Sequence, residues 1–297
     1  MKKHSQIYYY CGLWSVILMW SILPVLNPYF YKYISPSITT LISTFMATLS
    51  LIPLIKNHLS EINRHFLKVA LITGIFNASA TLIQKIGLLY TTPSRYAFLE
   101  NLSCVVVPVL MFIFIRQKPT VLKISASVLC LVGCFILSGN ILDGSGFGIG
   151  ELLCALSGIL YGVNIAATAS YATKFHAPLY VMVHMIVTVL ISGISAVVFN
   201  YITFNGAPIS PAYFKWNLPV LLLIAATGIL ANTVCWTIRT SVMKYIDATA
   251  VAVMMPFSAV ITGFLSIASG QDTLSLSLVI GGILVLAASI MSGLSDK

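Results

Sequence analysis

The sequence predicts an all-α membrane protein of ten transmembrane helices, arranged as two inverted five-helix halves. Of its 297 residues, 59% are hydrophobic and 8% are charged, and the mean hydropathy is +0.98. Soluble domains carry roughly a quarter charged residues, so a cytosolic globular protein is excluded. The hydrophobic share of the chain amounts to about 175 positions, which at about 20 residues per helix supply roughly eight to ten spans.

Ten apolar runs, separated by charged residues, Pro or Gly, mark the expected helices. They cover residues 7–30, 36–55, 68–90, 95–115, 120–138, 148–173, 178–203, 219–241, 246–268 and 274–293. The basic N-terminus and the run from Ile7 to Leu26 are similar to a signal sequence. That run is too long for one and lacks a small-residue cleavage site, so we expect an uncleaved first helix.

The distribution of positive charge predicts that both termini are cytoplasmic. Sixteen Lys and Arg against seven Asp and Glu give a net charge of +9. With the N-terminus inside, the inside segments hold Lys2, Lys3, Lys56, Arg64, Lys68, Arg116, Lys118, Lys123, Lys174, Arg239, Lys244 and Lys297. Only Lys32, Arg95 and Lys215 fall outside, and Lys85 lies within a span. This bias follows the positive-inside rule, and it appears only with an even number of helices. The excess of Lys and Arg therefore indicates the orientation in the membrane and does not indicate a nucleic-acid partner.

A glycine-rich linker at residues 138–150 divides the chain into two sets of five helices. We therefore expect two repeats, residues 1–140 and 141–297. Because five is odd, similar halves must enter the membrane from opposite faces, as in many secondary transporters. The halves share modest patterns: Tyr90-Thr91 before Pro108 and Tyr245-Ile246 before Pro256, and Leu131-Val132-Gly133 beside Ile280-Gly281-Gly282.

Several motifs carry a family resemblance across nearly the whole chain. They are residues 87–99, Val105-Val106-Val107-Pro108 and Arg116-Gln117-Lys118-Pro119 in the first half, and residues 151–156, 244–249, Pro256, Gly270-Gln271 and 280–284 in the second. Together they resemble the drug/metabolite transporter (DMT) superfamily, in its ten-helix EamA branch. The resemblance implies a transporter of amino acids, other small metabolites or drugs. The family often has Glu where this chain has Gln117 and Gln271, so no acidic role is carried over to these positions.

Lys85 and Glu100 are ionisable residues within predicted spans, which makes them candidates for function. Lys85 lies five residues before the expected end of the third helix at Tyr90, and Glu100 lies five residues after the expected start of the fourth helix at Arg95. Both are therefore expected roughly 7 to 8 Å inside the outer boundary of the membrane. One interpretation is a structural ion pair, or a Lys85 side chain that snorkels outward. The other is that both face a central cavity and bind the charged end of a solute or exchange a proton. The spacing leaves both open.

Other polar and aromatic side chains within the spans complete the candidate substrate site. They are Asn77, Gln84, Asn101, Trp20, Tyr161, Asn164, His184, Asn232 and Trp236. Any one of them could instead bond a neighbouring helix, but as a set they favour a watered cavity. Pro108 and Pro256 are the expected hinges, because proline frees a backbone carbonyl and bends a helix.

These residues favour secondary active transport of a small organic metabolite by alternating access, with protons as an optional coupling ion. A buried acid and a buried lysine together suit an amino acid or a similar zwitterion. The alternatives are uptake or facilitated exchange of a cationic solute such as a quaternary amine, or a non-transporting membrane scaffold. No H-E-x-x-H, C-x-x-C or phosphate-binding loop motif occurs, so we expect no enzyme, metal site or cofactor. The expected partners are a small-molecule solute and membrane lipids, around a monomer or homodimer in the plasma membrane of a bacterium.

Overall fold

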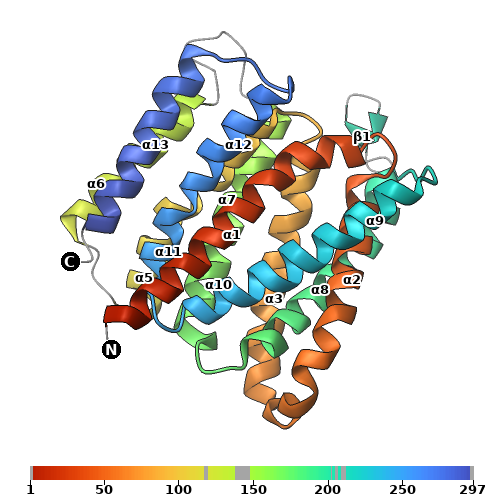
Figure 1. The fold of residues 1–297 in the computed structure, drawn as a ribbon, viewed down its shortest axis with the longest axis horizontal. Helices are drawn as coiled ribbons and strands as arrows, with labels where there is room; N and C mark the ends of the chain where they lie inside the picture. The colour runs from red at the N-terminus through yellow and green to blue at the C-terminus, as the bar shows by residue number, and fades with distance from the viewer. Residues whose placement is uncertain are drawn as a thin grey trace.

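A computed structural model of the chain confirms the ten predicted helical rods (Figure 1). It describes residues 3–116, 120–137, 148–201, 203–204, 207–208 and 212–294. Within these ranges, eight rods are long and apolar enough to cross a membrane, and two shorter apolar helices complete the set. Most of the linker predicted at residues 138–150, with the boundary between the expected repeats, lies outside the described residues.

The rods of the first half are formed by six α-helices and a short 3-10 segment. They are α1 (Lys3–Phe30), α2 (Pro36–Ile55) with its 3-10 extension (Lys56–Glu61), α3 (Arg64–Gly87), α4 (Pro93–Glu100) continued by α5 (Ser103–Ile115), and α6 (Val121–Leu137). The fourth rod is thus split in two, where the sequence predicts one continuous helix over 95–115.

The rods of the second half include two π-helical segments. They are α7 (Ile149–Ala167) with the π-helix η2 (Thr168–Ala172), α8 (Ala177–Tyr201), α9 (Leu218–Thr227) with the π-helix η3 (Gly228–Cys235) and α10 (Trp236–Val242), α11 (Ala248–Met254) with α12 (Pro256–Ala268), and α13 (Leu276–Leu294). Two short strands, β1 (Thr203–Phe204) and β2 (Ala207–Pro208), form a hairpin between α8 and α9.

Side-chain caps explain where several helices begin. Asn63 accepts a hydrogen bond from the backbone N–H of Phe66 (2.8 Å), and α3 therefore starts four residues before the predicted boundary. Asn217 and Asp247 cap α9 and α11 in the same way. These caps satisfy backbone donors that would otherwise lack a partner at the helix start.

The fourth and ninth rods are interrupted near their middles. At the first interruption, the N–H groups of Asn101 and Leu102 bond to carbonyls three residues back, those of Phe98 and Leu99 (3.1 and 3.2 Å). At the second, α11 ends at Met254 and α12 starts at Pro256, which has no N–H to continue the α-helical pattern.

The packing of the rods has a regular correspondence between the halves. In the first half, the third and fourth rods pack on the sixth rod. In the second half, the corresponding eighth and ninth rods pack on the first rod. The second and seventh rods, the fourth and ninth, and the fifth and tenth pack on each other. Figure 1 shows the last of these pairs, α6 and α13, side by side at one edge. These contacts are therefore preserved when each rod is exchanged with the one five places later.

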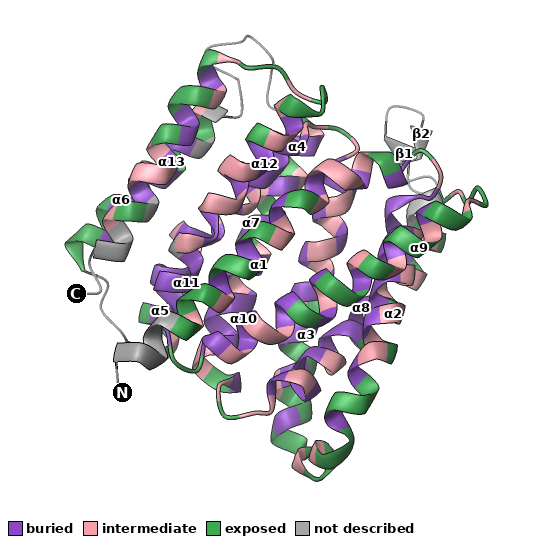
Figure 2. Cartoon of the chain, viewed as in Figure 1, coloured by how far each residue is buried: buried purple, intermediate pink, exposed green. Residues whose placement is uncertain are grey.

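Figure 2 shows buried residues on the faces of the helices that meet other rods and exposed residues on the outer faces. Many of the exposed residues are large and apolar. In Figure 1, α1 begins and α13 ends near each other at one end of the bundle, as an even number of crossings requires. The assignment of that end to the cytoplasm stays a prediction.

Candidate functional site

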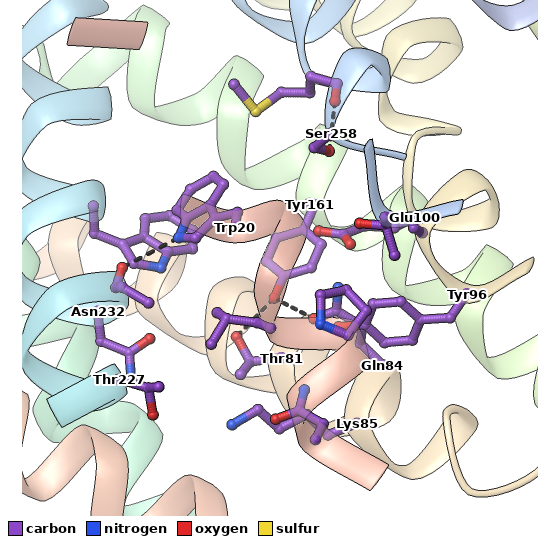
Figure 3. A pocket seen from close by; sticks show the side chains of 18 of the residues that line it. Trp20, Thr81, Gln84, Lys85, Tyr96, Glu100, Tyr161, Thr227, Asn232 and Ser258 are labelled. Carbon is purple, nitrogen blue, oxygen red and sulfur yellow. Dashed lines mark hydrogen bonds between the residues drawn. The ribbon is translucent and has the colours of Figure 1, made fainter. Parts of the chain in front are cut away.

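A cavity of ≈ 110 Å³ lies in the centre of the bundle. Its walls come from α1, α2, α3, α4, α5 and α7, and from α9, η3, α10 and α12. One water needs about 10–15 Å³ of such space, so the cavity has room for several waters or a small solute. Figure 3 shows its polar side chains converging from different helices.

Eight of the eleven predicted substrate-site residues line this cavity. They are Trp20, Gln84, Lys85, Glu100, Asn101, Tyr161, Asn232 and Trp236. They come from both halves of the chain, so residues more than two hundred positions apart share one wall. The sequence patterns missed other lining residues, among them Thr81, Tyr96 and Ser258.

Tyr161 is held by two hydrogen-bonding partners from α3. Its hydroxyl donates to Oε1 of Gln84 (2.9 Å) and lies 2.9 Å from the hydroxyl of Thr81 (Figure 3). These contacts fix the tyrosine ring in the cavity wall. The close fit of α7 depends on Gly158, because a Cβ there would lie 2.6 Å from the carbonyl oxygens of Leu99 and Glu100 at the interruption of the fourth rod.

Lys85 and Glu100 both face the cavity, on different sides of the Gln84–Tyr161 hydrogen bond in Figure 3. Because α3 ends at Gly87 and α4 starts at Pro93, Lys85 lies about 3 Å from its helix end and Glu100 about 10 Å from its helix start. The predicted equality of depth is therefore wrong. The ion pairs found in the described part of the chain are His58–Glu61, Arg95–Glu151 and Lys123–Asp247, and none of them joins Lys85 to Glu100.

Arg239 is a lining residue that the sequence patterns missed. The topology prediction assigned it to the inside segments, which is wrong: it lies on α10, is 3% exposed and faces the cavity. Its guanidinium carbon lies 4.5 Å from the ring centroid of Trp236 and 5.8 Å from that of Trp20. The signal available in the sequence was the spacing of Trp236 and Arg239, which places both on one helix face within an apolar run.

The other three predicted site residues, Asn77, Asn164 and His184, lie outside the cavity, and each is 1% exposed. His184 Nε2 lies 2.9 Å from the hydroxyl of Thr73, and the Tyr180 hydroxyl donates to the same oxygen (2.6 Å). The Asn164 amide donates to the Thr73 carbonyl (3.0 Å). This hydrogen-bonded group, the Thr73 cluster, joins α3, α7 and α8.

The two predicted hinge prolines have different positions. Pro256 is the first residue of α12, directly after the interruption of the ninth rod. Pro108 lies inside α5, six residues beyond Leu102. The Cys104 carbonyl, which loses its helical partner at Pro108, accepts a bond from the Ser127 hydroxyl (3.3 Å).

The hairpin that carries Lys85 and Glu100 is anchored by Glu151. This carboxylate, near the start of α7, accepts a hydrogen bond from the Thr91 hydroxyl (2.5 Å) and from the Gly148 N–H (3.0 Å). It also lies 3.7 Å from the Arg95 guanidinium. These contacts fix the turn between the third and fourth rods on the second half of the chain.

The lining charges are two cations and one acid, together with amides, hydroxyls and indole rings. Such a surface can bind a charged organic solute and release it. Among the described residues, no three His, Cys, Asp or Glu side chains are grouped as a metal site would require.

Residues 7–139, which contain the first five rods, match the EamA-like transporter family. This match covers less than half of the chain, so it shows a likeness of the first half to that family. An uncharacterized transporter of Archaeoglobus fulgidus is 23% identical over 291 residues, which cover 98% of this chain and 87% of that protein. A crystal structure of a protein superposes with a TM-score of 0.73 at 16% identity, covering 98% of this chain and 97% of the other, and this likeness shows the fold alone. With eight helices long and apolar enough to cross a membrane, the chain is a multi-pass membrane protein that is similar to EamA-like transporters.

Proposed function

We propose that this EamA-like protein is a secondary active transporter of an amino acid or a similar zwitterion. The observation that carries the proposal is the central cavity, whose walls contain an acid, two bases and aromatic rings from both halves of the chain. Charged side chains within a membrane are costly and mark solute pathways. The cavity also disfavours a non-transporting scaffold, which needs no polar interior.

Residues 1–140 and 141–297 are the two moving halves in this proposal. The regular correspondence of rod contacts supports an inverted repeat, because exchanging each rod with the one five places later preserves the packing. Rocking of such halves about a central site opens the cavity to one side of the membrane at a time.

Glu100 and Lys85 would bind opposite charges of the solute, or Glu100 would exchange a proton as the solute leaves. A zwitterion matches their two signs of charge. The alternative of a quaternary amine is less well supported, because Arg239 already lies against the Trp236 face that such a cation would need.

Uptake by the purified protein in proteoliposomes tests this function. A panel of radiolabelled amino acids, quaternary amines and nucleosides should give saturable uptake of an amino acid, with or without an imposed pH gradient. Glu100→Gln and Lys85→Met should each lower that uptake by about tenfold or more, since hydrogen bonds to charged groups contribute about 1.5–3 kcal/mol. Wild-type rates from both variants would assign the two residues to architecture, and selective uptake of the amines would favour the cationic alternative.

The hinge role of Pro108 and Pro256 is tested by replacing both with alanine. We expect slower transport and a shift in the accessibility of cavity cysteines to membrane-impermeant reagents, because a restored backbone bond stiffens the rod. The larger share of the effect should come from Pro256, which lies at the interruption of its rod. Unchanged rates and accessibility in the double variant would remove prolines from the mechanism.

A further inference from the structure

Arg239 is a buried cation without an acidic partner in the described part of the chain. Its side chain is part of the cavity wall, and its Nε has no hydrogen-bond partner among the described groups. Each of the three ion pairs found there involves other residues. Lys123, the other buried cation of the described chain, lies 3.5 Å from Asp247. Arg239 therefore differs from Lys123: the rings of Trp20 and Trp236 lie beside its guanidinium, and Glu100 of the same cavity acts on it electrostatically without forming an ion pair.

The surroundings of Arg239 hold its guanidinium in place. The indole N–H of Trp20 donates to the carbonyl of Ala231 in the π-helix η3 (3.2 Å), and the rings of Trp20 and Trp236 lie 5.4 Å apart. The guanidinium lies over both rings. Aromatic faces stabilise a cation without neutralising its charge, so the planar group stays oriented and able to accept an anion.

We propose that Arg239 binds a carboxylate group of the transported solute. The inference rests on the proposed transport function and adds a residue to it. A guanidinium presents paired N–H donors that match the two oxygens of a carboxylate. A buried charge is stable when it is paired. A carboxylate that enters the cavity would supply the ion-pair partner of the Arg239 guanidinium.

The position of Glu100 in the same cavity selects the kind of anion. A carboxylate on Glu100 would attract the ammonium group of an amino acid and repel a phosphate dianion. The wall holds Arg239, Lys85 and one acid. A solute with a carboxylate next to an amine gives Glu100 a cationic partner, which a phosphate ester does not.

Binding to the purified full-length protein tests this inference separately from transport. The probes are the common amino acids, each compared with its own carboxamide, and inorganic phosphate. Binding is read by thermal stabilisation and by the fluorescence of the protein. We expect the wild type to prefer at least one acid over its carboxamide by about tenfold or more, and to bind phosphate weakly.

The variants Arg239→Gln and Arg239→Lys isolate the role of the guanidinium. Arg239→Gln should abolish the preference for acid over carboxamide. Arg239→Lys keeps the positive charge but loses the paired N–H donors of the guanidinium, and it should retain a reduced preference for the acid. Arg64→Gln is the matched control, because Arg64 is exposed at the start of α3, away from the cavity.

The outcomes are distinct for the two proposals. A wild type that binds every carboxamide as well as its acid, or an Arg239→Lys variant with an unchanged preference, overturns the role of Arg239 even if transport is measured. An acid preference that disappears with Arg239→Gln supports it even if no panel member is transported, in which case only the proposed function fails. If Arg239→Gln does not fold, Arg239→Lys alone decides.

Discussion

Two threonine–tyrosine pairs lie eight residues apart on α3 and have different surroundings. Thr81 meets Tyr161 at 2.9 Å in the cavity wall, whereas Thr73 meets Tyr180 at 2.6 Å in the Thr73 cluster. Thr81 is partly exposed to the cavity, and Thr73 is 2% exposed. The two pairs use the same chemistry, but only the first faces a space that a solute can enter. Buried polarity alone therefore does not identify a transport site.

The comparison also separates the charged residues from the neutral ones. Lys85, Glu100 and Arg239 all line the cavity, whereas the Thr73 cluster consists of hydroxyl, amide and imidazole groups that bond to one another. Polar groups that satisfy each other hold helices together. Among the described residues, the three cavity charges form no ion pair with one another, and they face a space that a ligand can enter.

The largest expected difference is in transport by Tyr161→Phe and Tyr180→Phe. Tyr161→Phe removes the hydroxyl that orients Gln84 and should lower uptake by about tenfold, since losing a buried bond partner costs about 1–3 kcal/mol. Tyr180→Phe should leave uptake per folded molecule within about twofold, because its bonds lie outside the cavity. Proteoliposome uptake, normalised to folded protein, measures both. Equal losses would mean that the Thr73 cluster takes part in transport.

The free energy of unfolding should depend more on the Thr73 cluster than on the cavity pair, the reverse of the order expected for transport. Thr73→Val leaves Tyr180 and His184 without a shared partner in a dry site and should destabilise the protein by about 1–3 kcal/mol. Thr81→Val should cost less than about 1 kcal/mol, since water in the cavity can replace the lost hydroxyl. Thermal unfolding in detergent compares the two variants. A larger loss for Thr81→Val would contradict the distinction between the two sites.

The smallest expected effect concerns a polar contact outside the spans. The ring of His176, between η2 and α8, stacks on His58 with centroids 3.5 Å apart, and Glu61 accepts a hydrogen bond from the backbone N–H of His176 (3.3 Å). Burial lowers the pKa of His176, the nearby His58 and Lys244 lower it further, and Glu61 opposes them. A lowered pKa means that the unfolded chain takes up the proton first, so stability is present above about pH 6.5 and falls as the pH drops below it.

His176→Phe keeps the ring and removes the titrating group. Its melting temperature should fall less than that of the wild type between pH 7.5 and pH 5.5. We expect no effect on the cavity, because His176 does not line it. If the melting temperatures of the two proteins fall in parallel with pH, His176 does not contribute to the pH dependence of stability.

Much of the architecture was predictable because it follows from the chemistry of the bilayer. A spanning segment must be a long apolar helix when no water is present to satisfy its backbone, and ten apolar runs gave ten rods with closely similar bounds. The interruptions at Asn101–Leu102 and Met255 and the π-helix η3 were not predicted. These departures depend on neighbours, such as the backbone of Ser43, against which Gly228 packs.

The sequence by itself determined that this chain is a ten-helix membrane protein with polar groups in its spans, because hydropathy and polarity are properties of single residues and their order. Only the tertiary structure decided which of these groups share a cavity. It separated Tyr161 and Gln84 from His184 and Asn164, and it placed Arg239 in the centre instead of at a cytoplasmic end. The physical reason is that the outcome for each polar side chain depends on what packs against it, and those contacts join helices that are distant in the chain.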